Sequence, residues 1–252
     1  MTAPTGNVWV RRFHPAPESG GRVVCFPHAG GSATYYFPFS AALSPAADVL
    51  AVQYPGRQDR LQEPCITDVP VLADKLADEL AHWAERPLTF FGHSMGATVA
   101  FEVARRLEAR GVILRGFFAS GRRAPSRQRE EHVHLRDDQG LVEVLRRLSG
   151  TDAELLADDA VLTMVLPAMR GDYRAIETYR YRPGPPLNCP ILALTGDSDP
   201  LVEVAEARAW AHHTVAPFRL RVFPGGHFFL SDHITSIVRE ITDHLGVTVP
   251  GR

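Results

Sequence analysis

The sequence predicts an α/β protein in which a mostly parallel sheet is covered by helices on both faces. Short apolar runs of strand length alternate with helical segments over most of the 252 residues. The run at 88–91, Leu-Thr-Phe-Phe, is mostly apolar and aromatic, as in a strand buried on both faces. The alternation stops between about 122 and 187, where the pattern is helical and arginine-rich. We therefore expect one domain over 1–252, with a helical subdomain inserted at about 122–187.

The alternation defines the elements before the insertion. Strands are expected at 8–13, as an edge strand, and at 22–27, 48–54, 88–91 and 114–120. Helices are expected at 33–43, from Asp68 to about Trp83, and from Gly96 to Gly111. The second helix is marked most clearly, because Val69, Leu72, Leu76 and Leu80 fall on one face at helical spacing.

The insertion is expected to hold two helices, and the alternation resumes after it. Asp137 and Asp138 can cap a helix that carries Leu141, Val144 and Leu148, and a second helical region runs from about 155 to 176. Strands follow at 190–195 and 219–223, and a helix is expected at about 202–210. The closing helix carries an apolar face from Ile234 to Leu245, and Gly246 stands just past its end.

Composition excludes several functional classes. A net charge of −2 gives no reason to expect binding to nucleic acid or to an anionic membrane. No apolar stretch has the length of a signal peptide or a membrane span. Cys25, Cys65 and Cys189 show no C-x-x-C spacing, so we expect a reducing, cytoplasmic setting. Cys25 lies inside an apolar run and is expected to be a core residue rather than a nucleophile.

The segment Gly92-His93-Ser94-Met95-Gly96 is the main candidate for catalysis. It lies between a predicted strand and a predicted helix, which is the context of a nucleophile elbow. The glycines allow strand and helix to approach closely, and the serine hydroxyl is then exposed above the strand end. We predict that Ser94 is a nucleophile.

Serine is a poor nucleophile alone and needs a base that is itself oriented by an acid. His227 follows the last predicted strand in a Gly-Gly turn and is the candidate base. Asp199 is the favoured acid, with Asp197 as its rival, and both follow the strand at 190–195. The order Ser94, Asp199, His227 along the chain is that of the α/β-hydrolases.

The oxyanion of the reaction needs two donors. The backbone N–H groups of Met95 and Ala29 are the candidates, and Ala29 lies in the glycine-rich turn His28-Ala29-Gly30-Gly31. His28 is interpreted as a loop-stabilising residue rather than a second base. The spacing of histidines and carboxylates suggests no metal site. These residues predict a serine hydrolase that works through an acyl-enzyme, without naming the leaving group.

Several motifs resemble the free-standing type II thioesterases that accompany polyketide and nonribosomal peptide synthases. The markers run through nearly the whole chain: Phe26 to Ser32, Gln53 to Arg57 with Arg60, Glu63 and Pro64, Gly92 to Gly96, Tyr179 to Tyr181, Gly196 to Pro200, and Pro224 to Phe228. The elbow is common to all α/β-hydrolases. The His-Ala-Gly-Gly turn together with the Tyr-Pro-Gly-Arg loop is far more specific.

The resemblance implies an α/β-hydrolase fold and an enzyme that hydrolyses aberrant short acyl groups from the phosphopantetheine arm of carrier proteins. It implies the triad Ser94, Asp199 and His227, with Ala29 and Met95 at the oxyanion hole. It also implies that the 122–187 insertion is a mobile lid. The partner would be an acyl or peptidyl carrier protein, no cofactor would be needed, and we expect a monomer.

Two questions stay open at this point. Five insertion residues are candidates to line an acyl channel or merely to pack the lid: Leu155, Leu162, Val165, Met169 and Tyr173. A cluster of four arginines either meets an acidic carrier protein or reflects the arginine-rich composition: Arg122, Arg123, Arg127 and Arg129. The rival functions are a general small-ester esterase or lipase, an acyltransferase that excludes water, and a non-catalytic binding protein on the same fold.

Overall fold

A seven-stranded sheet forms the centre of the protein in a computed structural model, which describes residues 8–149 and 159–247. The strands lie in the order β1-β3-β2-β4-β5-β6-β7. Their bounds are Val10–Arg11 (β1), Arg22–Phe26 (β2), Asp48–Val52 (β3), Leu88–His93 (β4), Gly116–Ser120 (β5), Ile191–Gly196 (β6) and Phe218–Phe223 (β7). The pairing of β1 with β3 is antiparallel, and each of the other five pairings is parallel.

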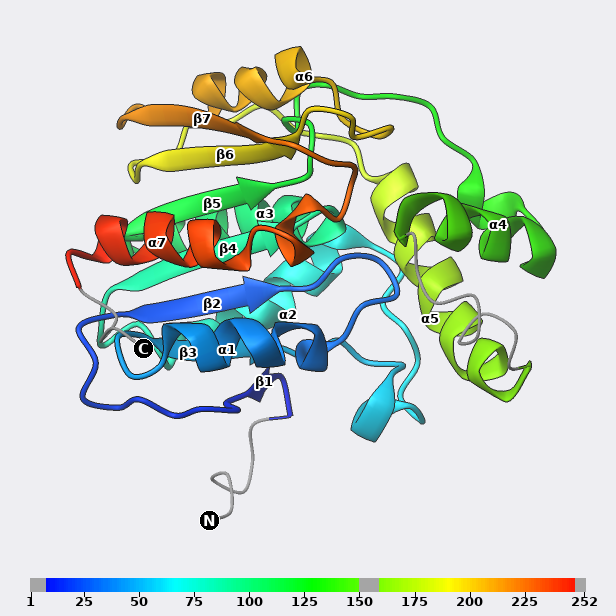
Figure 1. Cartoon of the computed structure of the whole chain (residues 1–252), viewed down its shortest axis with the longest axis horizontal. Coiled ribbons are helices and arrows are strands. Elements are labelled where there is room, and N and C mark those ends of the chain that lie inside the picture. The colour runs from blue at the N-terminus through cyan, green and yellow to red at the C-terminus, as the bar shows by residue number, and fades with distance from the viewer. Residues whose placement is uncertain (1–7, 150–158, 248–252) are drawn as a thin grey trace.

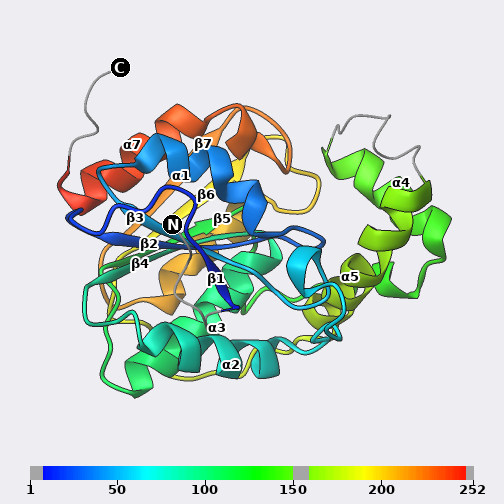
Figure 2. The same ribbon diagram turned by 90° about the horizontal axis from the view of Figure 1, so that it is seen from below.

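Helices cover both faces of this sheet (Figures 1 and 2). Their bounds are Phe37–Leu43 (α1), Val69–Ala81 (α2), Met95–Ala109 (α3), Asp138–Ser149 (α4), Asp159–Thr178 (α5), Val204–Arg208 (α6) and Ile234–Leu245 (α7). α1 and α7 pack on one face, and α2 and α3 pack on the other. The predicted mostly parallel sheet with helices on both faces is confirmed.

The alternation of side chains along β2 explains the two cores. Val24 and Phe26 belong to the core under α2 and α3, whereas Val23 and Cys25 belong to the core under α1 and α7. All four are fully buried, as expected for a central strand of a parallel sheet. Burial raises the pKa of the Cys25 thiol well above its usual value, which agrees with a core residue.

Two helix ends follow from their sequence signals. The Asp68 side chain accepts a hydrogen bond from the N–H of Val71 at 2.9 Å and caps α2. α7 ends at Gly246, which has a left-handed φ of 62°. The edge strand β1 is shorter than predicted and spans only two residues, because only Val10 and Arg11 pair with β3.

The insertion lies beyond the C-terminal ends of the parallel strands (Figure 1). α4 and the first half of α5 enclose a small separate cluster of Leu141, Val142 and Leu166. The second half of α5 packs on the main body instead, because Ala175 and Ile176 belong to the core under α2 and α3. The insertion therefore has an outer part with its own packing and an inner part anchored to the sheet.

Candidate active site

Ser94 lies at the sharp turn between β4 and α3. Its backbone has φ 54° and ψ −122°, a strained conformation for a residue with a side chain, and its N–H donates to the carbonyl of Ser120 at 2.8 Å. A Cβ on Gly96 would lie 2.0 Å from the carbonyl oxygen of Phe26, and one on Gly92 would lie 2.5 Å from that of Gly96. The strand and the helix therefore approach as closely as the elbow requires.

His227 connects Ser94 to Asp199. Its Nε2 lies 2.9 Å from the Ser94 Oγ, and its Nδ1 lies 2.9 Å and 3.1 Å from the two carboxylate oxygens of Asp199. The side chains of Asp199 and His227 are almost completely buried. The order of groups matches nucleophile, base and orienting acid.

Asp197, the rival acid, points elsewhere. Its exposed carboxylate accepts hydrogen bonds from the Gly225 N–H and the Ser198 hydroxyl, both at 2.9 Å. These bonds, with that from Gly225 contributing most, lower the pKa of Asp197. Asp197 thus ties the loop after β6 to the loop after β7.

Met95 and Ala29, the candidate oxyanion donors, both lie at the cavity that Ser94 lines. Met95 is the first residue of α3, where N–H groups have no acceptor inside the helix, and Ala29 lies in the turn after β2. Within the described residues, neither N–H has a hydrogen-bond partner. Ala29, Ser94 and Met95 line one cavity.

Two cavities of about 320 Å³ each adjoin at Ser94, and their walls share Ala29, Ser94, Leu148 and Tyr173. One, which we call the apolar branch, is lined mainly by rings and aliphatic side chains: His28, Tyr35, Leu145, Leu148, Met169, Tyr173 and Phe228. The other, the polar branch, has charged walls that include Arg122, Glu131, Arg136, Arg147 and Glu177.

The insertion residues that were candidates to line an acyl channel differ in whether they border a cavity at Ser94. Met169 and Tyr173 lie in the wall of the apolar branch. Leu162 instead packs between α4 and α5, and Val165 lines neither branch. Val165 is on the stripe of Met169 and Tyr173 but lies about 12 Å from Tyr173 along the helix axis. Leu155 lies outside the described residues.

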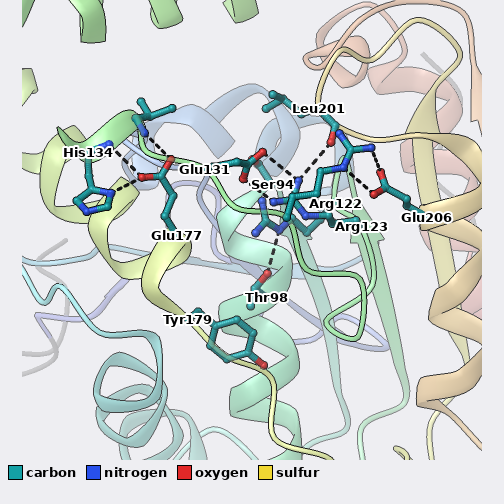
Figure 3. A network of polar contacts seen from close by, with 12 residues as sticks. Ser94, Thr98, Arg122, Arg123, Glu131, His134, Glu177, Tyr179, Leu201 and Glu206 are labelled. Atoms are coloured by element: carbon teal, nitrogen blue, oxygen red, sulfur yellow. Dashed lines mark hydrogen bonds and ion pairs between the residues drawn. The ribbon is translucent and has the colours of Figure 1, made fainter. Parts of the chain in front are cut away.

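The arginines after β5 are engaged within the chain (Figure 3). Arg122 donates from Nε to the Thr98 hydroxyl at 3.2 Å and lines the polar branch. Burial, and after it the neighbouring charge of Arg123, lower the pKa of its guanidinium to about 10. Arg123 pairs with Glu131, and Arg129 pairs with Glu203 and Glu206. Of the four arginines that were candidates to meet a carrier protein, these three therefore have partners within the chain.

Glu177 of α5 connects this helix to the segment at 133–134, which also belongs to the insertion. Its carboxylate accepts hydrogen bonds from the N–H groups of Val133 and His134, at 2.8 and 3.0 Å, and contacts the His134 ring (Figure 3). The ring of His134 therefore has a structural partner in Glu177. No group of three or more metal-ligating side chains is found in the parts of the chain that the structure describes.

A cluster of rings surrounds the base. The ring centroids of His28 and His93 lie 6.1 Å apart with the rings nearly perpendicular, and the ring centroid of Phe228 lies within 5.3 Å of both. Burial lowers the pKa of His28 to about 3, with further contributions from the charges of His227 and Arg57. Burial likewise lowers the pKa of His93 well below 6.5. Both histidines stay neutral at physiological pH, so His28 is a packing residue of its turn.

We expect these two neutral histidines to make the protein acid-labile. Their pKa values are lowered in the folded state, so the unfolded chain binds more protons below pH 6.5, the ordinary histidine pKa, and stability falls as the pH falls. The expected loss is roughly 3 kcal/mol per pH unit for the pair below pH 6.5, continuing to about pH 3 for His28. Urea unfolding at pH 7.5, 6.0 and 5.0 measures it. A free energy of unfolding that is constant over this range would contradict the neutral state of both rings.

Two buried residues near the site had no predicted role. Arg57, known only as part of the Tyr-Pro-Gly-Arg marker, forms a buried ion pair with Asp172 of α5. The only signal for Asp172 is an acidic residue within the apolar stripe of Met169, Tyr173 and Ile176, which indicates a carboxylate facing the interior.

Comparison with known proteins decides the family. A family model described as a thioesterase domain matches residues 21–245. The chain belongs to the thioesterase family. It is a thioester hydrolase with the α/β-hydrolase fold, as the resemblance implied.

Its relatives include thioesterases that are named for biosynthetic pathways. The chain is 55% identical over 241 residues to a probable cadicidin biosynthesis thioesterase of Streptomyces griseus, covering 96% of this chain and 67% of the relative. It is 53% identical over 244 residues to thioesterase PikA5 of Streptomyces venezuelae, covering 96% and 87%. The solved structure of the type II thioesterase BorB from the borrelidin biosynthetic cluster matches with 53% identity and a TM-score of 0.91, covering 96% of this chain and all of that one. The predicted resemblance to type II thioesterases is confirmed.

No helix in the described part of this thioesterase is long and apolar enough to cross a membrane.

Proposed function

We propose that this thioesterase hydrolyses short, aberrant acyl groups from the phosphopantetheine arm of an acyl or peptidyl carrier protein, and so restores a blocked polyketide or nonribosomal peptide synthase. The observation that carries the proposal is the hydrogen-bonded series Ser94, His227 and Asp199 beside a partly apolar cavity, in a chain so similar to type II thioesterases of such pathways.

In the proposed acylation step, His227 Nε2 accepts the Ser94 proton as the Oγ attacks the thioester carbonyl. The N–H groups of Ala29 and Met95 stabilise the tetrahedral oxyanion. The C–S bond then breaks, and the thiol leaves with the proton held by His227. The Asp199 carboxylate keeps Nδ1 protonated and stabilises the imidazolium that forms between the two transfers.

Water completes the reaction by the same path. His227 takes a proton from a water molecule that attacks the acyl-Ser94 carbonyl, and then returns the proton to Ser94 as the carboxylic acid leaves. Because a thiolate leaves readily, the enzyme needs little protonation of its leaving group. The chemistry requires only these side chains, the backbone donors and water, with no cofactor or metal.

The two branches at Ser94 suit the two parts of such a substrate. The apolar branch, with Met169, Tyr173 and Phe228 in its wall, provides the lining for an acyl chain. The charged polar branch provides hydrogen-bond partners for the amides of the pantetheine arm. Leu148 of α4 and Tyr173 of α5 border both branches, so we propose that the 122–187 insertion of this one domain is a lid over the site.

The test compares release of butyrate from three substrates: a butyryl acyl carrier protein, butyryl-pantetheine and ethyl butyrate. We expect the carrier-bound thioester to have the highest kcat/KM, and Ser94→Ala to lower it at least about 10³-fold. Equal or faster turnover of the ethyl ester would instead identify a general esterase. Release of butyrate by Ser94→Ala at the wild-type rate would exclude the acyl-serine step.

We also propose that the enzyme acts in the cytoplasm, as a monomer that binds its carrier protein in trans. Cys25, Cys65 and Cys189 are all unpaired, which suits a reducing compartment. Sedimentation of the enzyme at micromolar concentration, alone and with a carrier protein, measures the mass of the free enzyme and of its complex.

A further inference from the structure

A buried ion pair links the insertion to the turn that carries Ala29. The guanidinium of Arg57 makes two hydrogen bonds to the carboxylate of Asp172 on α5, at 2.6 and 2.9 Å. The side chains are 6% and 3% exposed. Burial alone would lower the pKa of Arg57, but the charge and hydrogen bonds of Asp172 outweigh it, so the pKa is raised and the guanidinium remains charged.

Both members of the pair hold the glycine-rich turn. The N–H of Gly30 donates to Asp172 Oδ2 at 2.8 Å, and Arg57 Nη1 donates to the carbonyl of Gly31 at 3.0 Å. The turn itself closes with a hydrogen bond from the Gly31 N–H to the His28 carbonyl at 2.9 Å. Gly30 has a φ of 75°, as at the third position of a type II turn.

The hydrogen bond at Gly30 determines which way this turn faces. Turns of types I and II differ by rotation of their central peptide, here the one between Ala29 and Gly30. Rotation to the type I orientation would turn the Gly30 N–H away from Asp172 and lose a charge-assisted hydrogen bond in a buried site. The Ala29 N–H belongs to the preceding peptide, which this rotation does not turn. The bond at Gly30 therefore acts on it by fixing the whole turn against α5, and Ala29 lines the cavity beside Ser94.

We propose that Asp172, held by Arg57, is a positioning residue that keeps the Ala29–Gly30 turn in the orientation in which the Ala29 N–H stabilises the oxyanion. This inference rests on the proposed acyl-serine mechanism. Since Asp172 belongs to α5, the inner half of the insertion is part of the catalytic framework, and lid movement is confined to α4 and the outer half of α5.

The anchoring of α5 supports this division. Ala175 and Ile176, on the next turn of the helix, are buried in the main core, whereas Leu162 and Leu166 pack only with the small outer cluster. Movement of Asp172 with an opening lid would separate two buried charges, which is strongly unfavourable. The inner half of α5 therefore stays in place when the outer part moves.

A pair of double variants separates the hydrogen bond at Gly30 from the ion pair. Replacing Asp172 alone with an apolar residue would leave Arg57 as an unpaired buried cation and destabilise the protein. Arg57→Met with Asp172→Leu removes both charges, which stable folds tolerate, but leaves the Gly30 N–H without an acceptor. Arg57→Met with Asp172→Asn also removes both charges but keeps an oxygen that can accept from Gly30.

We expect the leucine variant to have a kcat for butyryl-pantetheine 10- to 100-fold below that of the asparagine variant, with KM within about threefold. Butylboronic acid, which bonds to the Ser94 Oγ and places an oxygen at the oxyanion site, should bind the leucine variant more weakly by a similar factor. A structural role alone would not make inhibitor affinity and kcat fall together at constant KM.

The controls keep the two hypotheses separate. Wild-type enzyme that releases no butyrate from the thioester would overturn the proposed function, whatever the variants do. Active wild-type enzyme, with folded double variants whose kcat values agree within threefold, would overturn the role of Asp172. If the leucine variant does not fold, Arg57→Met with Asp172→Ala replaces it, because alanine likewise leaves the Gly30 N–H without an acceptor. A kcat and a boronate affinity equal to those of the asparagine variant would then also overturn the inference.

Discussion

Asp199→Asn is expected to lower the kcat for thioester hydrolysis about 10³- to 10⁴-fold, whereas Asp197→Asn should leave it within about threefold. Asp199 accepts from the Nδ1–H of His227 and thereby leaves Nε2 free to take the Ser94 proton. An asparagine at this position can donate to Nδ1 and stabilise the wrong tautomer, and it cannot stabilise the imidazolium. The loss should therefore appear in kcat, with KM little changed.

Asp197 is a matched control, since it lies two residues away on the same loop. Its carboxylate only holds the N–H of Gly225 and the hydroxyl of Ser198, and an asparagine oxygen can still accept from Gly225. Steady-state kinetics on butyryl-pantetheine, with thermal unfolding to verify the fold, measures both variants. An Asp197→Asn variant as inactive as Asp199→Asn would show that the choice between the two carboxylates is wrong.

Gly96→Ala is expected to lower the free energy of unfolding by at least about 3 kcal/mol, or to prevent folding. The added Cβ would lie 2.0 Å from the Phe26 carbonyl oxygen and 2.6 Å from that of Pro27. Both are backbone atoms, and they lead into the turn that carries Ala29, so neither can move without distorting β2 or the oxyanion donors. A loss of this size corresponds to a fall in Tm of about 10 °C for a protein of this length.

Gly111→Ala is the control for the loss of a glycine. No atom lies within 4 Å of a Cβ at Gly111, although its φ of 83° is unfavourable for alanine. We expect a cost of only about 1 kcal/mol there. Differential scanning calorimetry compares the two variants. Equal Tm values for Gly96→Ala and Gly111→Ala would mean that contact with Phe26 does not decide the elbow geometry.

The sheet could be predicted because its signals are local. The apolar run before Gly92 and the helical face from Val69 to Leu80 reflect burial and periodicity, which are written into a few neighbouring residues. β1 was predicted less well, since an edge strand extends only as far as its partner pairs with it, here for Val10 and Arg11. That limit depends on β3, forty residues away in the chain.

The candidate site likewise has residues that local motifs predicted and a choice that only the packing of distant loops could settle. Ser94 and His227 stand beside glycines at predicted strand ends, so type and spacing alone made them candidates for an acyl-transferring enzyme. The preference for Asp199 over Asp197 became a geometric fact only when the loops after β6 and β7 were placed side by side.

The sequence by itself determined the parallel α/β sheet, the elbow, the order of the three candidate catalytic residues and the resemblance to the thioesterases, because each of these depends on neighbouring residues. The tertiary structure alone decided that Met169 and Tyr173 border the cavity while Leu162 and Val165 do not. It alone brought Asp172 to Arg57 and Gly30, across 115 and 142 positions of the chain. The physical reason is that a buried charge is stable only with its partner, and the identity of that partner depends on how distant segments pack.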